Sequence, residues 1–255
     1  MAKILGVIPA RFEASRFRGK LLEPLHGRPV LEWVYRRACL LEGIDRLLIA
    51  TDDERIEETA QGFGAEVLRT SSSHRSGTDR IGEVLEEVSR GSDGAPEFVV
   101  NLQGDEPLLP VAAVDAMIAA MVTSAGSALF TLVHRIESDE EFARPSVVKV
   151  VVGNGRALYF SRSPIPYPRS EDARVERWRH VGIYGYPTHL LRRWLALEPS
   201  PLEECEGLEQ LRALEAGIEF RVIESDAVSP GIDVPEDLSR LAREVSREQM
   251  ERGIR

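Results

Sequence analysis

The alternation of apolar strand-like runs with helical patterns restricts this chain to a small set of folds. In the first half, short runs rich in β-branched residues alternate with segments whose apolar residues recur at helical spacing. The strands predicted from these runs cover residues 4–8, 46–50, 66–68 and 98–102. The helices predicted between them cover residues 29–41, 53–62, 78–90 and 111–122. Because runs that are apolar on both faces are typical of parallel strands covered by helices, we predict an α/β fold.

The second half of the chain has shorter and more varied elements. The predicted strands cover residues 128–132, 147–152, 157–160, 180–185 and 220–223. The predicted helices cover residues 190–197 and 201–216, and a last helix opens near Asp233. The Gly-Asn-Gly triplet at 153–155 predicts a hairpin turn, and the charged, proline-containing loop 163–179 is expected to be exposed. We therefore expect a mixed, mainly parallel sheet flanked by helices in one domain, 1–255, with a smaller lobe at about 138–199.

Composition argues against several classes of protein. The 255 residues carry a formal net charge of −10, which disfavours non-specific binding to nucleic acid. No apolar run approaches the ~18 residues of a membrane span, and the first residues lack the pattern of a secretory signal. The two cysteines, Cys39 and Cys205, are too few for a disulfide framework or a zinc cluster. We expect a cytoplasmic protein with no nucleic-acid or membrane partner.

A cationic loop follows the first predicted strand. Residues 9–20, PARFEASRFRGK, contain Arg11, Arg16, Arg18 and Lys20. Ligands of parallel α/β sheets bind at the carboxyl ends of the strands, and several cations there suit a polyanion such as a triphosphate. The loop matches neither the Walker pattern nor GxGxxG. The alternative interpretation is a solvated basic loop.

Two acidic motifs are candidates for a metal site. Asp105 lies in NLQGDEP just beyond a predicted strand, and Asp233 lies in GIDVPED far along the chain. Mg²⁺ prefers oxygen ligands and is often bound by one or two carboxylates together with substrate phosphates. The alternatives are a turn aspartate at 105 and a helix N-cap at 233. Asp233 becomes a metal ligand only if the fold brings it to Asp105.

Further polar residues lie beside predicted strands or at the start of predicted helices. The motif HRSGTDRI, 74–81, opens a helix with backbone N–H groups that can read a phosphate or a base edge, or it is a simple N-cap. Arg162 in FSRSPIP could grip a carboxylate through two parallel hydrogen bonds. His180 and Tyr184 flank a buried strand, and Glu209 and Gln210 lie within a predicted helix. Each of these residues, taken alone, has a structural interpretation as well.

The order of these motifs carries more information than any one of them. The blocks PAR, SR and GK are followed by SGTDR, QGDEP, KVV, ALYFSRSPIP, RHVGIYGY, SPLEECEGLEQLRAL and GIDVPEDL. In this order they resemble the 3-deoxy-manno-octulosonate (Kdo) cytidylyltransferase family, the CMP-Kdo synthetases, over about residues 4–241. The resemblance implies a nucleotide-diphospho-sugar transferase-like fold and a homodimer held by the smaller lobe. It implies conversion of CTP and Kdo to CMP-Kdo and pyrophosphate for lipopolysaccharide biosynthesis.

The resemblance also implies a role for each candidate residue. It assigns the triphosphate to Arg11, Arg16 and Lys20, and the cytidine half to Ser76, Gly77, Thr78 and Arg80. It assigns Mg²⁺ to Asp105 and Asp233. It assigns the sugar acid to Gln103, Arg162, His180, Tyr184, Glu209 and Gln210, with Arg162 opposite the carboxylate. Because no side chain stands out as a general base, we expect a metal to lower the pKa of the attacking hydroxyl.

Two positions bear on the choice of substrate and on the first loop. Arg18 stands where the family usually has a proline before Gly-Lys, which adds a charge and removes a backbone constraint. Glu106 in QGDEP fits the ordinary Kdo enzymes of the family, whereas close relatives that act on an 8-amino analogue of Kdo tend to differ there, so the resemblance implies Kdo as the acceptor. The alternatives are a cytidylyltransferase for that analogue or for a sialic acid, and a non-catalytic nucleotide-binding regulator. Lys20, Asp105 and Asp233 favour an enzyme.

Overall fold

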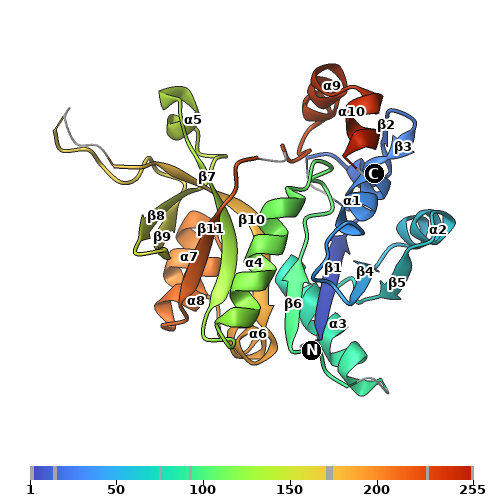
Figure 1. Ribbon diagram of the computed structural model, residues 1–255, viewed down its shortest axis with the longest axis horizontal. Helices are drawn as coiled ribbons and strands as arrows, with labels where there is room; N and C mark the ends of the chain where they lie inside the picture. Colours follow the sequence, from blue (N-terminus) through green and yellow to red (C-terminus); the bar gives the residue numbers. More distant parts are fainter. Residues whose placement is uncertain are drawn as a thin grey trace. The chain divides into compact units, whose positions relative to one another are not determined.

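The computed structural model describes residues 3–13, 16–74, 76–91, 94–170, 175–227 and 230–253 (Figure 1). The chain divides into two compact units. Unit 1 comprises residues 1–115 and 228–255, and unit 2 comprises residues 116–227. The smaller lobe expected at 138–199 falls within the residues of unit 2.

Unit 1 contains a parallel set of strands. Its strands are β1 (Ile4–Ala10), β4 (Arg46–Thr51), β5 (Glu66–Arg69) and β6 (Phe98–Asn101). They lie in the order β5-β4-β1-β6, and every neighbouring pair is parallel. Side chains on both faces of β1 are buried, because Leu5, Val7 and Ile8 are at most 2% exposed. These strands confirm the pattern predicted for the first half.

The helices of unit 1 follow the strands as predicted. They are α1 (Val30–Ala38), α2 (Glu54–Gly62), α3 (Gly77–Arg90), α9 (Pro235–Glu244) and α10 (Arg247–Arg252). The sequence interpretation missed α10, the short helix η1 (Lys20–Leu22), and the two-residue strands β2 (Pro24–Leu25) and β3 (Arg28–Pro29). Ile232, Leu241 and Met250 pack in one buried cluster with Trp33 and Leu25. This cluster fixes the C-terminal segment, and therefore Asp233, to the rest of unit 1.

Unit 2 holds a mixed sheet. Its strands are β7 (Leu129–Arg135), β8 (Lys149–Gly153), β9 (Arg156–Ser161), β10 (Trp178–Pro187) and β11 (Phe220–Glu224). They lie in the order β10-β7-β11-β9-β8, and β8 also pairs with β10. Only the β7–β11 pair is parallel among the pairings described for this unit. Together with unit 1, this confirms a mixed α/β architecture.

The helices of unit 2 include two departures from prediction: the sequence interpretation missed the short helix at Asp139–Ala143, and it placed one helix where the structure has two. They are α4 (Val111–Thr123), which begins in unit 1, α5 (Asp139–Ala143), α6 (Thr188–Leu195), α7 (Pro201–Glu206) and α8 (Gln210–Glu215). The single helix predicted for 201–216 is wrong, because Gly207 adopts a left-handed conformation with φ 62° and ends α7. Glu209 and Gln210 therefore lie at the start of α8 instead of inside a longer helix.

The structure also bears on the cysteines and on the question of a membrane-spanning helix. Cys39 and Cys205 are free, exposed thiols. Among the helices of the described ranges, none is long and apolar enough to cross a membrane.

The predicted hairpin joins β8 to β9 through a turn of a specific type. Asn154 and Gly155 both have positive φ angles, 53° and 72°. Two consecutive positive φ values are the mark of a type I′ turn, which matches the right-handed twist of paired strands. A Cβ atom placed on Gly155 would meet no atom within 4 Å, so a substitution there tests the backbone conformation alone.

We expect Gly155→Ala to lower the free energy of unfolding by about 1 kcal/mol, because alanine is strained in the left-handed region. Gly62→Ala is the matched control. Gly62 ends α2 and also has open space around its Cβ position, so the change should raise stability by about 0.5 kcal/mol. Urea unfolding of both variants measures the difference. Equal effects of the two changes would contradict the turn assignment.

Candidate active site

One lysine in unit 1 contacts both acidic residues predicted for the metal. The Lys20 ammonium group makes a short contact with Asp105 Oδ2 and lies 3.3 Å from Asp233 Oδ1. The Lys20 side chain is only 14% exposed, so this charge is largely removed from water. The fold therefore brings Asp233 to Asp105, which is the condition that the sequence left open.

The loops after β1 and β6 approach each other closely at this point. A Cβ atom on Gly104 would lie 3.0 Å from the Pro9 carbonyl oxygen, so only glycine fits without a shift. The next residue, Asp105, accepts a backbone hydrogen bond from Ile232 at 3.1 Å. These contacts place Asp105 beside Lys20 on one side and beside the segment of Asp233 on the other.

The alternative interpretation of Asp233 as a helix N-cap is wrong. The backbone N–H groups of Asp233 and Val234 donate to Asp237 Oδ2 at 3.0 and 3.1 Å, so Asp237 supplies the carboxylate that caps α9. The Asp233 carboxylate instead contacts Lys20 and lies 3.1 Å from Arg16 Nη2. Asp233 therefore places a negative charge beside Arg16 and Lys20 of the cationic loop.

The donor set around Lys20 fits one kind of metal site. Asp105 and Asp233 offer carboxylate oxygens to a common point, and no group of three or more potential ligands occurs among the described residues. The described residues therefore do not indicate a metal site made of protein ligands alone. Two carboxylates leave room for a hard ion that arrives with phosphate oxygens, which is the usual mode for Mg²⁺. Metal binding itself stays a prediction.

Arg11 connects the cationic loop to the start of α3. Its Nη2 donates to the carbonyl oxygens of His74 and Ser76 at 2.7 and 2.8 Å. The Ser76 hydroxyl accepts from the Asp79 backbone N–H and caps α3, which confirms the capping interpretation of this motif. Gly77 follows close to Pro9, whose side chain would lie 3.8 Å from a Cβ atom there. The motif at 76–80 is therefore anchored to the loop that carries Arg11.

The other residues of this group differ in their access to a ligand. Thr78 and Arg80 have no exposed surface. Arg80 donates to the Thr70 hydroxyl and lies 3.2 Å from Asp52 Oδ2, so it ties α3 to the ends of β4 and β5. Gln103 is half-buried in the turn after β6. Two cations of the loop are exposed: Arg16, at 63%, pairs with Asp233, and Arg18, at 66%, pairs with Glu13.

Unit 2 brings a second group of predicted residues onto neighbouring elements. His180 and Tyr184 lie on β10, with ring centroids 5.3 Å apart, and Phe160 packs edge-on against His180 at 5.1 Å. Burial lowers the pKa of His180 to about 3, with a smaller contribution from Arg179. Burial likewise raises the pKa of Tyr184 well above its usual value. Both rings are therefore neutral near pH 7.

Arg162 is held by several backbone carbonyl groups. Its Nε donates to the Glu206 carbonyl at 2.7 Å and its Nη2 to Gly207 at 3.3 Å. Its Nη1 donates to the Pro145 carbonyl at 3.2 Å. The Nε edge of the guanidinium is thus occupied, and a carboxylate would have to approach the two terminal nitrogens.

Glu209 and Gln210, which lie at the break between α7 and α8, are half-buried and buried, respectively. Gln210 is 3% exposed, and its Nε2 has no hydrogen-bond partner in the part of the chain that the structure describes. Glu209 is half-buried beside it. A buried amide donor without a protein partner is suited to a ligand oxygen.

Sequence reasoning missed the residues that hold this second group in place. Lys149 is fully buried, and its ammonium group donates to the carbonyls of Arg144, Val147 and Arg162. The Glu206 carboxylate accepts from the Ser161 hydroxyl and the Arg162 backbone N–H. The 32 basic residues include only three lysines, Lys3, Lys20 and Lys149, and this scarcity is the one sequence signal that could have pointed toward Lys149.

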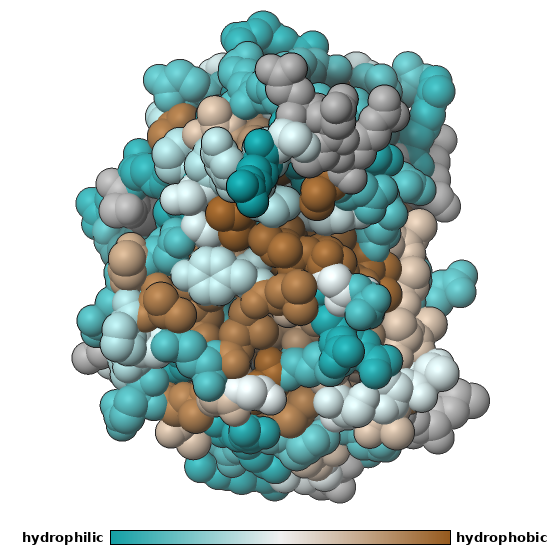
Figure 2. All heavy atoms as spheres, turned by 90° about the vertical axis from the view of Figure 1, so that its left-hand side faces the viewer, coloured by the Kyte–Doolittle hydropathy of each residue, from teal (hydrophilic) through white to brown (hydrophobic). Residues whose placement is uncertain are grey.

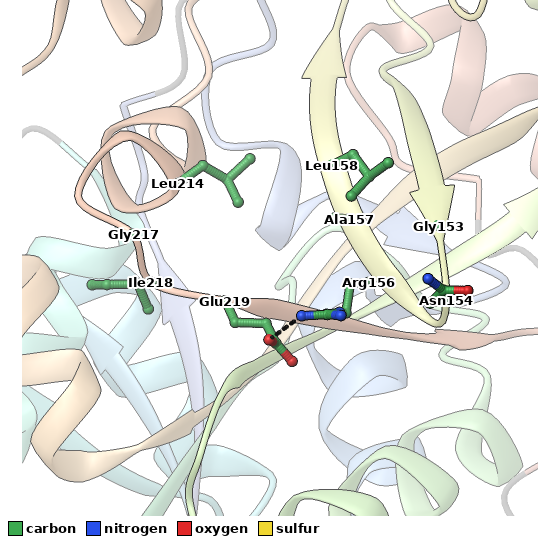
Figure 3. Close-up of a pocket in the computed structure, with 9 residues that line it drawn as sticks. All are labelled: Gly153, Asn154, Arg156, Ala157, Leu158, Leu214, Gly217, Ile218 and Glu219. Atoms are coloured by element: carbon green, nitrogen blue, oxygen red, sulfur yellow. Dashed lines mark hydrogen bonds and ion pairs between the residues drawn. The ribbon is translucent and has the colours of Figure 1, made fainter.

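A separate pocket in unit 2 is lined by none of the predicted site residues. It has a volume of about 330 Å³ and lies between the β8–β9 turn and the segment joining α8 to β11. Leu158 and Leu214 form one side, and an ion pair of 3.0 Å between Arg156 and Glu219 forms the other (Figure 3).

Comparisons with known proteins define the class and then the family. A family model described as cytidylyltransferase matches residues 5–221. A 3-deoxy-manno-octulosonate cytidylyltransferase of Solibacter usitatus is 46% identical over 94% of both chains. The corresponding protein of Escherichia coli is 41% identical over 98% of this chain and 99% of its own. A solved structure of CMP:2-keto-3-deoxy-manno-octonic acid synthetase complexed with CTP has a TM-score of 0.90 and 41% identity, covering 97% of this chain and 100% of the other.

The fold and the matched length therefore define a cytidylyltransferase, a class of nucleotidyltransferase. Within that class, the chain belongs to the 3-deoxy-manno-octulosonate cytidylyltransferase family. The resemblance carried by the ordered motifs is confirmed.

The lowered pKa of His180 predicts how stability depends on pH. In the unfolded chain the imidazole takes up a proton near pH 6.5, whereas in the folded protein it does so only near pH 3. Between these values the unfolded state binds more protons, so the contribution of His180 to stability is lost as the pH falls. This loss amounts to about 2 kcal/mol between pH 7 and pH 5.

We expect His180→Asn to remove this part of the acid sensitivity, so that its free energy of unfolding changes less between pH 7 and pH 5 than that of the parent. Urea unfolding at both pH values measures the change. His189→Asn, at an exposed position in α6, controls for loss of an imidazole and should leave the pH dependence as in the parent. An unchanged pH dependence in His180→Asn would show that the ring is not buried as described.

Proposed function

We propose that this protein transfers the cytidylyl group of CTP to Kdo and releases pyrophosphate, as a step of lipopolysaccharide biosynthesis. The main support is the match over nearly the whole chain, at 41% identity and a TM-score of 0.90, to a CMP:2-keto-3-deoxy-manno-octonic acid synthetase that was solved in complex with CTP. The contacts of Lys20 with Asp105 and Asp233 in unit 1 also support this proposal, because they bring together residues assigned to the triphosphate and the metal.

The chemistry follows from the two substrates. The anomeric hydroxyl oxygen of Kdo forms a bond to the α-phosphorus of CTP. The bond from that phosphorus to the α–β bridging oxygen breaks, its electron pair leaves with pyrophosphate, and the hydroxyl proton passes to water. Both reactants are anions, so the protein must position them and neutralise charge that would otherwise keep them apart. Transfer to phosphorus depends mainly on such positioning and charge stabilisation.

Unit 1 carries the residues proposed for CTP. Lys20 and Arg16 supply positive charge for the triphosphate, and Arg11 holds the loop against the start of α3. Ser76, Gly77, Thr78 and Arg80 form the block proposed for the cytidine half. Since the Thr78 and Arg80 side chains are fully buried, we infer that they hold this block in shape while its backbone faces the nucleotide.

Asp105 and Asp233 are the residues proposed to hold Mg²⁺. When bound, the ion supplies charge neutralisation for the triphosphate and lowers the pKa of an attacking hydroxyl. The two carboxylates are paired with Lys20 and Arg16, and these two cations would be free to contact phosphate if the carboxylates held the ion.

Unit 2 and Gln103 of unit 1 carry the residues proposed for the sugar acid. His180, Tyr184, Glu209 and Gln210 present neutral and acidic groups suited to hydroxyls. Arg162 is proposed for the carboxylate through its terminal nitrogens, since carbonyl groups occupy its Nε edge. Glu106 favours Kdo over the 8-amino analogue.

A homodimer in the cytoplasm is proposed with the smaller lobe as its contact. Figure 2 shows apolar surface gathered on the side of the molecule where β8 and β9 lie. Leu158 of β9 is 60% exposed, and Val151 and Tyr159 on these strands are half-buried. An apolar patch of this kind supports a protein contact.

The reaction is tested by pyrophosphate release from CTP. We expect release with Kdo in the presence of Mg²⁺, and little release without the ion. A sialic acid and the 8-amino analogue of Kdo serve as control acceptors. Release with a control acceptor alone would keep the chemistry and overturn the acceptor, and CTP binding without release would favour a nucleotide-binding regulator.

We expect Asp105→Asn and Asp233→Asn each to reduce turnover at least about a hundredfold, because each removes a charge from the proposed ion site. Thermal melting checks that both variants fold. Glu58→Gln, an exposed position on α2, is the control for loss of one carboxylate and should keep full activity. Near-parental turnover in either aspartate variant would remove that residue from the site.

A pair of arginine variants separates the two substrates. Arg162→Ala should raise the KM for Kdo about tenfold and leave the KM for CTP nearly unchanged, since a charged hydrogen bond is lost. Arg16→Ala should do the reverse. Steady-state kinetics with each substrate varied in turn measures both. An equal effect of Arg162→Ala on the two KM values would contradict its assignment to the sugar acid.

A further inference from the structure

Thr131 is a fully buried residue in β7 whose hydroxyl group meets three polar partners. Its Oγ1 lies 2.8 Å from the Ile183 carbonyl oxygen and 3.2 Å from the Val181 carbonyl oxygen. The third partner is Nε2 of His180, at 2.9 Å. All of these groups belong to unit 2.

An irregularity in β10 brings these partners together. Val181 pairs with Leu132 of β7, but the next pairing joins Tyr184 to Thr131, so two residues of β10 intervene. The carbonyls of Val181 and Ile183 both lie within hydrogen-bond distance of the Thr131 hydroxyl. His180 and Tyr184 flank this bulge and have ring centroids 5.3 Å apart. Bulges commonly redirect side chains beside functional sites.

The Thr131 hydroxyl has a single hydrogen, and this determines which nitrogen of the His180 ring carries the proton. A threonine hydroxyl has one hydrogen to donate and two lone pairs to accept with. The two carbonyl groups can only accept, so they take the hydroxyl hydrogen. The His180 nitrogen must therefore donate to Oγ1, and the ring proton is on Nε2. Burial lowers the pKa of His180 to about 3, so the ring carries no second proton near pH 7.

The other ring nitrogen is then an acceptor. Nδ1 has no hydrogen-bond partner among the residues that the structure describes, and His180, although mostly buried, keeps a smaller part of its surface exposed. A lone pair can accept from a hydroxyl but repels a carboxylate oxygen. Given the proposed function, on which this step rests, the acceptor is available to the polyhydroxylated part of the sugar acid.

We infer that Thr131 is a positioning residue that fixes the His180 proton on Nε2, so that Nδ1 accepts a hydrogen bond from a hydroxyl group of the sugar acid. Thr131 itself does not touch the substrate. His180 thereby selects a hydroxyl, and the carboxylate is left to positively charged groups.

The tautomer can be measured without substrate. Two-bond ¹⁵N–¹H correlation spectra of the full-length protein at pH 7 distinguish protonated from unprotonated ring nitrogens. The signals of His180 are assigned by their absence in His180→Asn. We expect a protonated Nε2 and an unprotonated Nδ1 in the parent protein. A protonated Nδ1 in the parent would overturn the inference, whatever the enzyme's activity.

Two variants of Thr131 separate the hydroxyl from its surroundings. Thr131→Ser keeps the hydroxyl and should keep both the parent tautomer and the parent KM for Kdo. Thr131→Val keeps the shape and removes the hydroxyl, so it should shift the ring toward the other tautomer and raise the KM for Kdo about tenfold. The KM for CTP should change less than about twofold. A folded Thr131→Val protein with the parent tautomer and the parent KM for Kdo would contradict the role of Thr131.

Failure of this inference is distinguishable from failure of the proposed function. If Thr131→Val does not fold, the parent and Thr131→Ser spectra still decide the tautomer. If the parent protein does not use Kdo, pyrophosphate release fails while the spectra are unaffected. Equal increases of both KM values in Thr131→Val would show a general structural defect and would overturn the positioning role.

Discussion

The contact of one lysine with two aspartates from distant parts of the chain is the interaction on which unit 1 depends. Lys20 follows β1, Asp105 follows β6, and Asp233 precedes α9, yet both carboxylates reach the same ammonium group. This requires Gly104 to pass close to Pro9, and it requires the C-terminal segment to pack through Ile232, Leu241 and Met250. A largely buried ammonium group needs such partners, because an unpaired charge there would be costly. The same arrangement brings these two carboxylates together with two cations, Lys20 and Arg16.

Unit 2 contains several buried or half-buried polar groups that are joined by hydrogen bonds within the unit. Lys149 donates to three carbonyls, Glu206 accepts from Ser161 and Arg162, and Thr131 joins the bulge of β10 to His180. Groups of this kind favour one arrangement of the backbone, because leaving any member unpaired is costly. They support the residues that the family resemblance assigns to the sugar acid, and none of them could be recognised as a site residue by its type alone.

The strands and helices of the chain were largely predictable because burial dictates their periodicity. Residues 4–8 and 98–102 are apolar on both faces and became β1 and β6, and Asn154-Gly155 formed the expected turn. The break at Gly207 was missed because helical spacing continues on both sides of it, and only the positive φ angle shows the interruption. At the site, Asp105 and Lys20 could be predicted from their place after strands. The meeting with Asp233 and the role of Thr131 could not, since both depend on contacts between segments far apart in sequence.

The most direct test of this account is the position of a divalent ion in a crystal of the protein with CTP. With Mn²⁺ in place of Mg²⁺, anomalous scattering locates the ion without reference to the protein's own density. The account predicts a peak about 2.1 Å from a carboxylate oxygen of Asp105 and from one of Asp233, with Lys20 turned toward the triphosphate. An ion bound by phosphates alone, with Lys20 still bridging the two carboxylates, would contradict it.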